Sequence, residues 1–377
     1  MIYTFTVFTS SKELPGNWNT IVGQHNVLLS REYFHSLEFA CPENMKCYFV
    51  AFFKEKRLIG GALFQYLNFV QHKTFQKGNS FFNIKNYITK TFTEDILILG
   101  NNMLTGQNGF YFDPAEIAIT HTVDLLAEAS FELQKRKKTS LITYKDYQEN
   151  FITHFKSKNI RSFYRFSVQP NMILNLRNRW ISFDDYLNAL STKYRTRAKS
   201  AKKKSMGIEK SEIYIEDLRK YQKEMNILYQ NVAENAPFNT FFLPEDHFEN
   251  LKESLNENFK VFGYFFNKKL IGFYTLILNN QDIDTYFLGY DKKIQKEKQI
   301  YLNMLLDMTE FGINQHFHRI IFGRTALEIK STIGAEPVEI FGFIKHNNRL
   351  INRFMEKIFP FLNPKIEWIQ RKPFKSI

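Results

Sequence analysis

The sequence predicts an α/β (α+β) fold built from two copies of one domain, each a mixed twisted sheet flanked by helices. Three observations lead to this prediction. The 377 residues suffice for two to three domains at about 150 residues each. Apolar residues make up 44% and charged residues 24% of the chain, close to ordinary globular usage. One aromatic hairpin pattern also occurs twice, about 190–210 residues apart, much farther than in a solenoid repeat.

The repeated pattern reads YFVAFFKEKRLIGGALF at 48–64 and FGYFFNKKLIGFYTLI at 262–277. Each copy has an aromatic strand ending in Phe-Phe, a short turn with lysine, and a second apolar strand that begins with Leu-Ile-Gly. Two strand-like runs around a short polar turn predict a β-hairpin.

The elements after each hairpin also agree in order. Each hairpin leads to a strand ending in Leu-Gly, a polar loop, an amphipathic helix and a further strand. This agreement favours a duplicated domain over chance recurrence in a chain with 40 phenylalanines. The junction lies near Phe166, and no Pro/Gly/Ser linker marks it. We therefore expect closely packed domains at 1–165 and 166–377, with the active site in the second. In the two copies, the strand after the hairpin is 96–100 or 284–289, the amphipathic helix is 115–136 or 299–316, and the further strand is 141–144 or 319–322.

A cationic helix is expected after residue 182. Ser182 and Asp185 have the spacing of a capping box, and Gly207 is a candidate C-cap. Residues 193–204 hold seven cations and no acid. Arg195, Lys199 and Lys202 share one face at helical spacing, which is typical of a phosphate-binding surface. The alternative is a solvated helix end whose cations complement the helix dipole.

The net charge of +13 favours acidic partners, namely phosphates, nucleic acid, CoA-like cofactors or anionic lipid. The codon bias of an AT-rich genome is the competing explanation. Two cysteines are too few for a disulfide framework. The N-terminus alternates like a strand rather than a signal peptide, and no apolar run is long enough to span a bilayer. We expect a cytoplasmic protein, with peripheral contact at the inner face of the membrane left open.

The segment 323–335 is the first candidate for chemistry. It follows a predicted strand and contains Arg324, Glu328 and Lys330, which cannot all be buried without partners. Glu328 is a candidate base if Arg324 and Lys330 orient it. The alternative is a structural Arg324–Glu328 pair.

The turn from 288 to 301 is the second candidate. A loop that leads into a helix N-terminus can hold a pyrophosphate with its backbone amides, so Gly289, Tyr290 and Tyr301 are candidate cofactor-binding residues. His247, in the first turn of a predicted helix, is a candidate base or substrate contact, or else a surface histidine. His316 and His318 lack further ligands, so no metal site is expected.

Several enzyme classes lack support in this sequence. It has no G-x-S-x-G, no P-loop and no Rossmann fingerprint, which argues against α/β-hydrolases, P-loop NTPases and NAD enzymes.

The order of elements resembles the GCN5-related N-acetyltransferase (GNAT) fold. The tandem arrangement resembles the Fem-type aminoacyltransferases and the GNAT-like proteins of peptidoglycan biosynthesis and recognition. The second half carries the more specific resemblance, over about 170–340, whereas the first half matches only through the repeat. The resembling segments are Trp180–Leu187, Tyr194–Arg197 and Gly323–Lys330.

This resemblance implies acyl transfer by direct attack of an amine, with a base, an oxyanion donor and a phosphate cradle. The usual acetyl-CoA loop, Arg/Gln-x-x-Gly-x-Gly/Ala, is absent at both 101–109 and 291–298. No bound cofactor is expected; acyl-CoA, an acyl-carrier protein or an aminoacyl-tRNA remains open as donor, and DNA is not expected as a partner. The implied roles are Glu328, Asp284 and Arg324 in catalysis, Arg195, Lys199, Lys202, Gly289, Tyr290 and Tyr301 on the donor, and His247, Lys330 and Tyr286 on the substrate.

The leading functional hypothesis is an N-acyltransferase that moves an acyl group from a phosphopantetheine thioester to an amine acceptor, such as an amino-lipid or a sphingoid-type base. The first alternative is a Fem-type enzyme that moves an amino acid from tRNA to a peptidoglycan precursor. The second is an inactive tandem protein that only binds a ligand.

Overall fold

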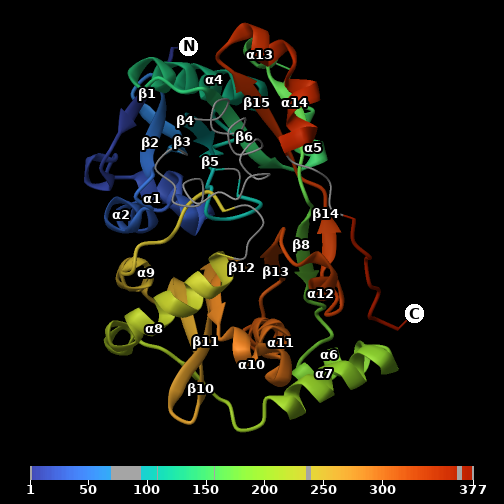
Figure 1. Cartoon of the computed structure of the whole chain (residues 1–377). Helices are drawn as coiled ribbons and strands as arrows, with labels where there is room; N and C mark the ends of the chain where they lie inside the picture. Colours follow the sequence, from blue (N-terminus) through green and yellow to red (C-terminus); the bar gives the residue numbers. More distant parts are fainter. Residues whose placement is uncertain are drawn as a thin grey trace, which may run out of the picture. The chain divides into compact units, whose positions relative to one another are not determined.

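The computed structural model describes residues 2–68, 95–107, 109–156, 158–234, 239–362 and 367–375. The chain divides into two compact units (Figure 1). Each unit contains a mixed sheet flanked by helices, which confirms the predicted fold class. No helix among the described residues is long and apolar enough to cross a membrane. Unit 1 comprises Met1–Gln169, Asn239–Pro244 and Glu339–Ile366, and unit 2 comprises Pro170–Phe238, Glu245–Val338 and Glu367–Ile377.

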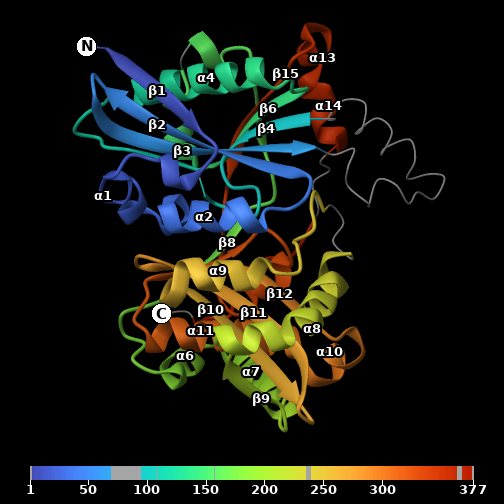
Figure 2. The same ribbon diagram turned by 90° about the vertical axis from the view of Figure 1, so that its left-hand side faces the viewer.

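The sheet of unit 1 is antiparallel except for one parallel pair, β4 with β6. Its helix α4 (Ile119–Arg136) covers one face, and α1 (Trp18–Ile21) and α2 (Arg31–Ala40) cover the other (Figure 2). The strand order is β1 (Tyr3–Phe8), β2 (Met45–Lys54), β3 (Arg57–Asn68), β4 (Asp95–Leu99), β6 (Leu141–Tyr147), β15 (Phe341–His346) and β7 (Tyr164–Ser167), with β5 (Phe110–Phe112) paired to β3.

The sheet of unit 2 repeats this pattern, with β12 and β13 as its parallel pair. Helices α8 (Ile215–Ala233) and α9 (His247–Leu255) pack on one face, whereas α11 (Ile300–Asn314) packs on the other. The strand order is β9 (Glu209–Glu212), β10 (Phe259–Phe266), β11 (Lys269–Asn279), β12 (Asp282–Tyr290), β13 (Arg319–Gly323), β8 (Asn171–Asn175) and β14 (Glu336–Val338).

The two predicted hairpins have the same register and the same irregularity. Gly60 pairs with Phe52 in unit 1, and Gly272 pairs with Tyr264 in unit 2; a bulge follows in both, at the isoleucine of Leu-Ile-Gly. The turns use left-handed residues, Glu55 in one hairpin and Asn267 in the other. The repeat is therefore confirmed, although the register matches Phe52 with Tyr264, so the Phe-Phe alignment is shifted by one residue.

The sheet of unit 1 contains one strand, β15, that follows the strands of unit 2 in the sequence. β15 lies between β6 and β7 in unit 1. In unit 2, β8 lies between β13 and β14 (Figure 1). Residues 339–366, which the sequence assigns to the second domain, thus belong to unit 1, because β15 pairs there on both sides. The short connections 168–170 and 339–340 link β7 to β8 and β14 to β15, where the chain passes from one unit to the other. The sequence shows no linker because only two or three residues separate the strands at each of these crossings.

The predicted capping box is present at Ser182 and Asp185. The predicted single helix is instead two, α6 (Phe183–Ala189) and α7 (Thr192–Lys204), because Leu190 and Ser191 are extended. Leu190 forms a bridge with Phe374, which ties this break to the C-terminal segment.

Candidate functional site

The parallel pair of unit 2 separates at its carboxyl end. β12 and β13 pair over Asp282–Asp284 and Arg319–Ile321, beyond which β12 continues along β11 and β13 along β8. A bulge bends β12, and the Thr275 hydroxyl fills it by donating to the Phe287 carbonyl at 2.8 Å and accepting from the Phe287 amide at 3.1 Å. Open α/β sheets bind ligands outside the carboxyl ends of their strands, so this edge is the candidate site.

Asp284, Tyr286 and His247 lie on the face of the sheet that α9 covers. The imidazole Nε2 of His247 lies 2.9 Å from the Tyr286 hydroxyl, and the two rings stack with centroids 5.7 Å apart. Asp284 is fully buried two residues earlier on β12 and accepts a hydrogen bond from Asn279 at 3.2 Å. His247 is only 1% exposed, so the surface-histidine alternative is wrong. The structure thus brings together His247 and Tyr286, both of which the sequence predicted as substrate contacts. The predicted catalytic carboxylate of Asp284 lies two residues before Tyr286 on β12.

Lys330 lies at the end of β13, on α12 (Leu327–Ser331). Its side chain is buried, at 3% exposed, and its Nζ donates to the carbonyls of Phe322 at 2.5 Å and Gly323 at 3.4 Å. Gly323 has φ +75°, a conformation that glycine adopts without strain. Burial lowers the pKa of Lys330 to about 7, because the interior disfavours the charged ammonium. This amine can therefore donate or accept a proton near neutral pH.

Glu328 and Arg324 do not form the pair that the sequence allowed. Glu328 has its side chain 49% exposed and pairs with Arg371, whose Nε lies 3.0 Å from the carboxylate. Arg324 is half-buried and makes no hydrogen bond or ion pair within the described part of the chain. The catalytic role of Glu328 stays a prediction, and its neighbour Lys330 is the residue that reaches the strand end.

The cations of α7 divide into two groups. Lys202 pairs with the buried Asp307 of α11, which also accepts from the Tyr264 hydroxyl, and Lys202 lies 3.4 Å from Glu310. Arg195 is half-buried, whereas the rest of the group is exposed: Lys193, Arg197, Lys199, Lys203 and Lys204. Lys202 is thus tied to the core of unit 2, and the exposed cations remain for a ligand. Sequence reasoning missed Asp307, although a carboxylate that follows the apolar run Met304–Leu306 within a helix is a signal for such a network.

The segment 288–301 contains a short helix rather than a glycine-rich loop. α10 (Lys292–Lys298) occupies it, with the Asp291 carboxylate accepting from the Lys293 amide at 2.8 Å. A Cβ on Gly289 would lie 2.4 Å from the backbone of Leu228 in α8. This glycine therefore permits close packing of α8 on β12. The rings of Tyr290 and Tyr301 approach each other with centroids 6.2 Å apart, and burial raises the pKa of both phenols.

The equivalent edge of unit 1 is closed by its own chain. Lys145, on β6, is buried, and its Nζ donates to the carbonyls of Asn101 and Leu104, each at 2.9 Å. It also pairs with Asp146, whose carboxylate accepts from the Gly106 amide at 3.0 Å. These contacts hold the loop after β4 against β6, at the position where unit 2 has its parted strands.

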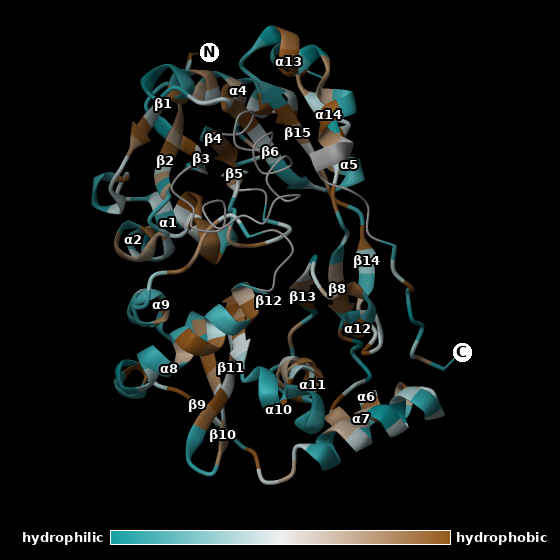
Figure 3. Ribbon diagram, viewed as in Figure 1, coloured by the Kyte–Doolittle hydropathy of each residue, from teal (hydrophilic) through white to brown (hydrophobic). Residues whose placement is uncertain are grey.

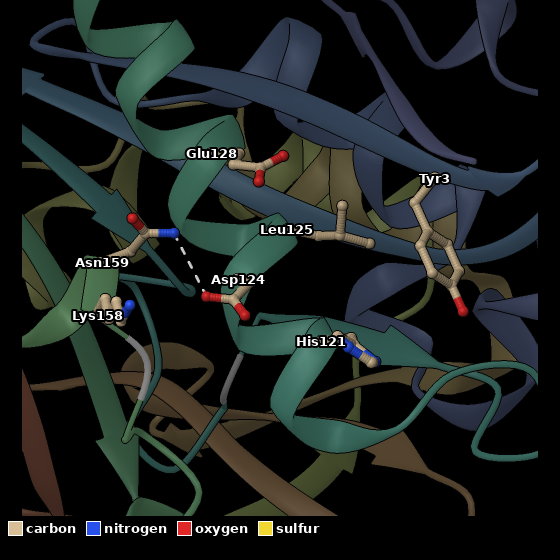
Figure 4. A pocket seen from close by; sticks show the side chains of 7 residues that line it. All are labelled: Tyr3, His121, Asp124, Leu125, Glu128, Lys158 and Asn159. Carbon is tan, nitrogen blue, oxygen red and sulfur yellow. Dashed lines mark hydrogen bonds between the residues drawn. The ribbon is translucent and has the colours of Figure 1, made fainter. Parts of the chain in front are cut away.

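A hollow of about 680 Å³ lies elsewhere on unit 1, between α4 and β1 (Figure 4). Asp124 accepts a hydrogen bond from Asn159 at 3.3 Å at its edge. No residue singled out from the sequence lines it. Its lining is Tyr3, His121, Asp124, Leu125, Glu128, Lys158 and Asn159.

The chain matches no protein-family model and no curated protein at a significant level. Its fold does match solved structures. FemX aligns at 12% identity over 94% of this chain and 100% of its own, with a TM-score of 0.57. The C-terminal domain of a putative lysylphosphatidylglycerol synthetase from Agrobacterium fabrum aligns at 7% identity over 90% and 94%, with a TM-score of 0.51. A tandem GNAT protein from the clavulanic acid biosynthesis pathway aligns at 8% over 92% and 98%, with a TM-score of 0.50.

Proposed function

We infer the function of this chain from its tandem GNAT-like fold, which is similar to that of FemX and of a tandem GNAT protein. We propose that the chain transfers an acyl or aminoacyl group from a polyanionic donor to an amine, with unit 2 as the catalytic unit. The observation that carries this proposal is the parting of β12 and β13 beside the buried amine of Lys330. Closure of the matching edge of unit 1 by Lys145 supports the choice of unit 2.

The proposed reaction forms a bond between the acceptor nitrogen and the donor carbonyl carbon. The acceptor arrives mostly as an ammonium and must lose a proton to a base within about 3 Å or one water away. The carbonyl oxygen becomes an oxyanion, and the thioester or ester bond then breaks as the leaving group takes up a proton. Lys330, as an ammonium, has a third N–H to donate to the oxyanion. Asp284 and His247 with Tyr286 are the buried candidates for the acceptor side, and Glu328 is the exposed one.

Two donor classes fit the charge of unit 2. A phosphopantetheine thioester, on CoA or an acyl-carrier protein, would be held through its phosphates. An aminoacyl-tRNA is the alternative, and the charge of two helices favours it. α7 carries seven cations and α10 carries four, and Glu297 is the one acidic residue in these two helices. The two helices lie in contact. Such an extended surface suits a long phosphate backbone. For the acceptor, an amino-lipid or sphingoid-type base accompanies the first donor, and a peptidoglycan precursor accompanies the second.

Transfer assays with matched donors test the proposal. The purified chain would be offered a radiolabelled long-chain acyl-CoA, the same acyl group on acyl-carrier protein, and tRNA charged with a labelled amino acid, each with a mixture of amine acceptors. We expect labelled amide from one donor class. Loss of product after ribonuclease treatment would assign aminoacyl-tRNA, and resistance would assign the thioester. Tight binding of all donors without any transfer would instead support the inactive binding protein.

A further inference from the structure

The C-terminal helices of unit 1 present an amphipathic surface that the transfer reaction does not use. α13 (Arg349–Arg353) and α14 (Met355–Leu362) follow each other with only Phe354 between them. Phe354 forms a hydrogen-bonded turn between them, and its carbonyl accepts from the amides of Lys357 at 2.9 Å and Ile358 at 3.1 Å. This turn joins the two helices directly, and residues four apart within α13 and its C-cap lie on one side.

Two parallel stripes run along this outer side. Leu350 and Phe354 form the apolar stripe and are 73% and 52% exposed. The cationic stripe is also exposed and consists of Arg349, Arg353 and Lys357. Arg349 and Arg353 directly precede Leu350 and Phe354 in the sequence. Figure 3 shows hydrophobic and hydrophilic segments following one another along α13 and α14. We call this set the α13–α14 surface: Arg349, Leu350, Arg353, Phe354 and Lys357.

The inner side of the same helices is fixed to the sheet. Met355 is buried in a cluster with β6, β7 and β15, and the ring of Phe359 packs on Phe166 with centroids 4.5 Å apart. The Asn348 carbonyl oxygen of the side chain caps α13 by accepting from the Leu350 amide at 2.9 Å. The exposed apolar side chains are thus held in place and are not the product of a fraying end.

We propose that the α13–α14 surface binds an anionic lipid bilayer and attaches the chain to it peripherally. Exposed Leu and Phe next to a row of Lys and Arg is the pattern of helices that lie in the membrane interface. Glu356 is the single acid on these helices within the described residues, so the surface is complementary to anionic headgroups. The charge here is independent of α7, which belongs to unit 2.

Co-sedimentation of the full chain with vesicles tests this proposal. Vesicles of phosphatidylcholine mixed with phosphatidylglycerol would be compared with vesicles of phosphatidylcholine alone. We expect binding to the anionic vesicles only, weakening as salt is raised. Replacing one cation, Arg353→Gln, should lower the partition coefficient about five-fold. The pair Leu350→Gln and Phe354→Gln should lower it about ten-fold or more.

A matched control is available on α8. Lys223 and Ile227 are an exposed cation and an exposed apolar side chain four residues apart in unit 2, and Lys223→Gln with Ile227→Gln should leave vesicle binding unchanged. Equal binding of wild type and the α13–α14 variants would overturn the proposal, as would no binding of wild type. Analytical ultracentrifugation tests whether the surface instead contacts a second copy of the chain. A wild-type dimer that the same variants convert to monomer would show such a protein interface and would reject binding to the bilayer. All variants should keep the wild-type melting temperature, since the replaced side chains are exposed.

Discussion

Lys330 and Lys252 form a matched pair of buried lysines in unit 2. The Lys252 Nζ also donates to carbonyls, at 3.1 Å to Asn256 and 3.0 Å to Phe259, and lies 3.9 Å from the Glu212 carboxylate; burial also lowers its pKa. We predict that Lys330→Met lowers kcat by about 10²–10³-fold, the effect of losing an oxyanion donor, whereas Lys252→Met leaves kcat unchanged. Each variant leaves carbonyls without a donor, which costs about 1–3 kcal/mol, partly offset because methionine is apolar. Turnover and urea unfolding would be measured together; equal losses of kcat in both would reject a catalytic role for Lys330.

The lowered pKa of Lys330 also predicts a pH dependence of stability. The folded chain releases this proton at about pH 7, whereas the ordinary value is 10.5. Between these values the unfolded chain binds more protons, so the stability contributed by this group rises with pH across the window. Below about pH 7 both states are protonated and the slope vanishes. Urea unfolding of wild type and Lys330→Met across the window measures the effect: the wild type should gain on the variant as pH rises. If the free energies of unfolding of the two proteins change in parallel with pH, the pKa of Lys330 is not lowered in the folded chain.

The hydrogen bond between Tyr286 and His247 predicts a role in substrate binding. Tyr286→Phe removes the hydroxyl but keeps the stacked ring. We expect KM for the acceptor to rise several-fold with kcat nearly unchanged, since one lost hydrogen bond is worth about 1 kcal/mol. Tyr186→Phe is the control, because the Tyr186 hydroxyl donates to the Ile333 carbonyl at 2.8 Å in the core. If both variants change only the melting temperature, the Tyr286 hydroxyl is structural.

At the scale of elements, α7 predicts a salt-dependent donor interaction. Arg195→Ala with Lys199→Ala should weaken donor binding, most strongly at low salt, because screening already reduces such contacts at high salt. Fluorescence titration with the donor that passes the transfer assay would measure this. Lys220→Ala with Lys223→Ala, on the exposed side of α8, is the control and should bind like wild type. Wild-type affinity of the α7 double variant at low ionic strength would make this helix a solvated face only.

Elements with local signals could be predicted from the sequence, and those with distant partners could not. The two hairpins follow from the repeated aromatic strand, turn and Leu-Ile-Gly pattern, and the start of α6 follows from the Ser182 cap, because both depend on neighbouring residues. The division between α6 and α7 depends on Phe374, far along the chain. In the site, Lys330 was expected to touch substrate, but its burial depends on the carbonyls of Phe322 and Gly323, which only the folded turn brings to its amine.

At the scale of the whole molecule, the placement of β15 in unit 1 had no sequence signal. β15 is a short strand of ordinary composition, and its place depends on pairing with β6 and β7, which lie far earlier in the chain. The repeat therefore revealed two copies of one fold, while a linear division at residue 166 misplaced the return of the chain to unit 1.

The difference between the two copies predicts the donor stoichiometry. Unit 2 has parted strands beside exposed cations, whereas in unit 1 Lys145 and Asp146 hold the loop after β4 in the matching place. A donor could enter unit 1 only by displacing a buried ion pair, and breaking such a pair costs about 3–5 kcal/mol. We therefore expect one donor molecule per chain by isothermal titration calorimetry and by native mass spectrometry. Lys145→Met should lower the melting temperature yet keep this single binding event, while Arg195→Ala with Lys199→Ala should weaken it. Two equivalent binding events in wild type would contradict the assignment of the donor to unit 2 alone.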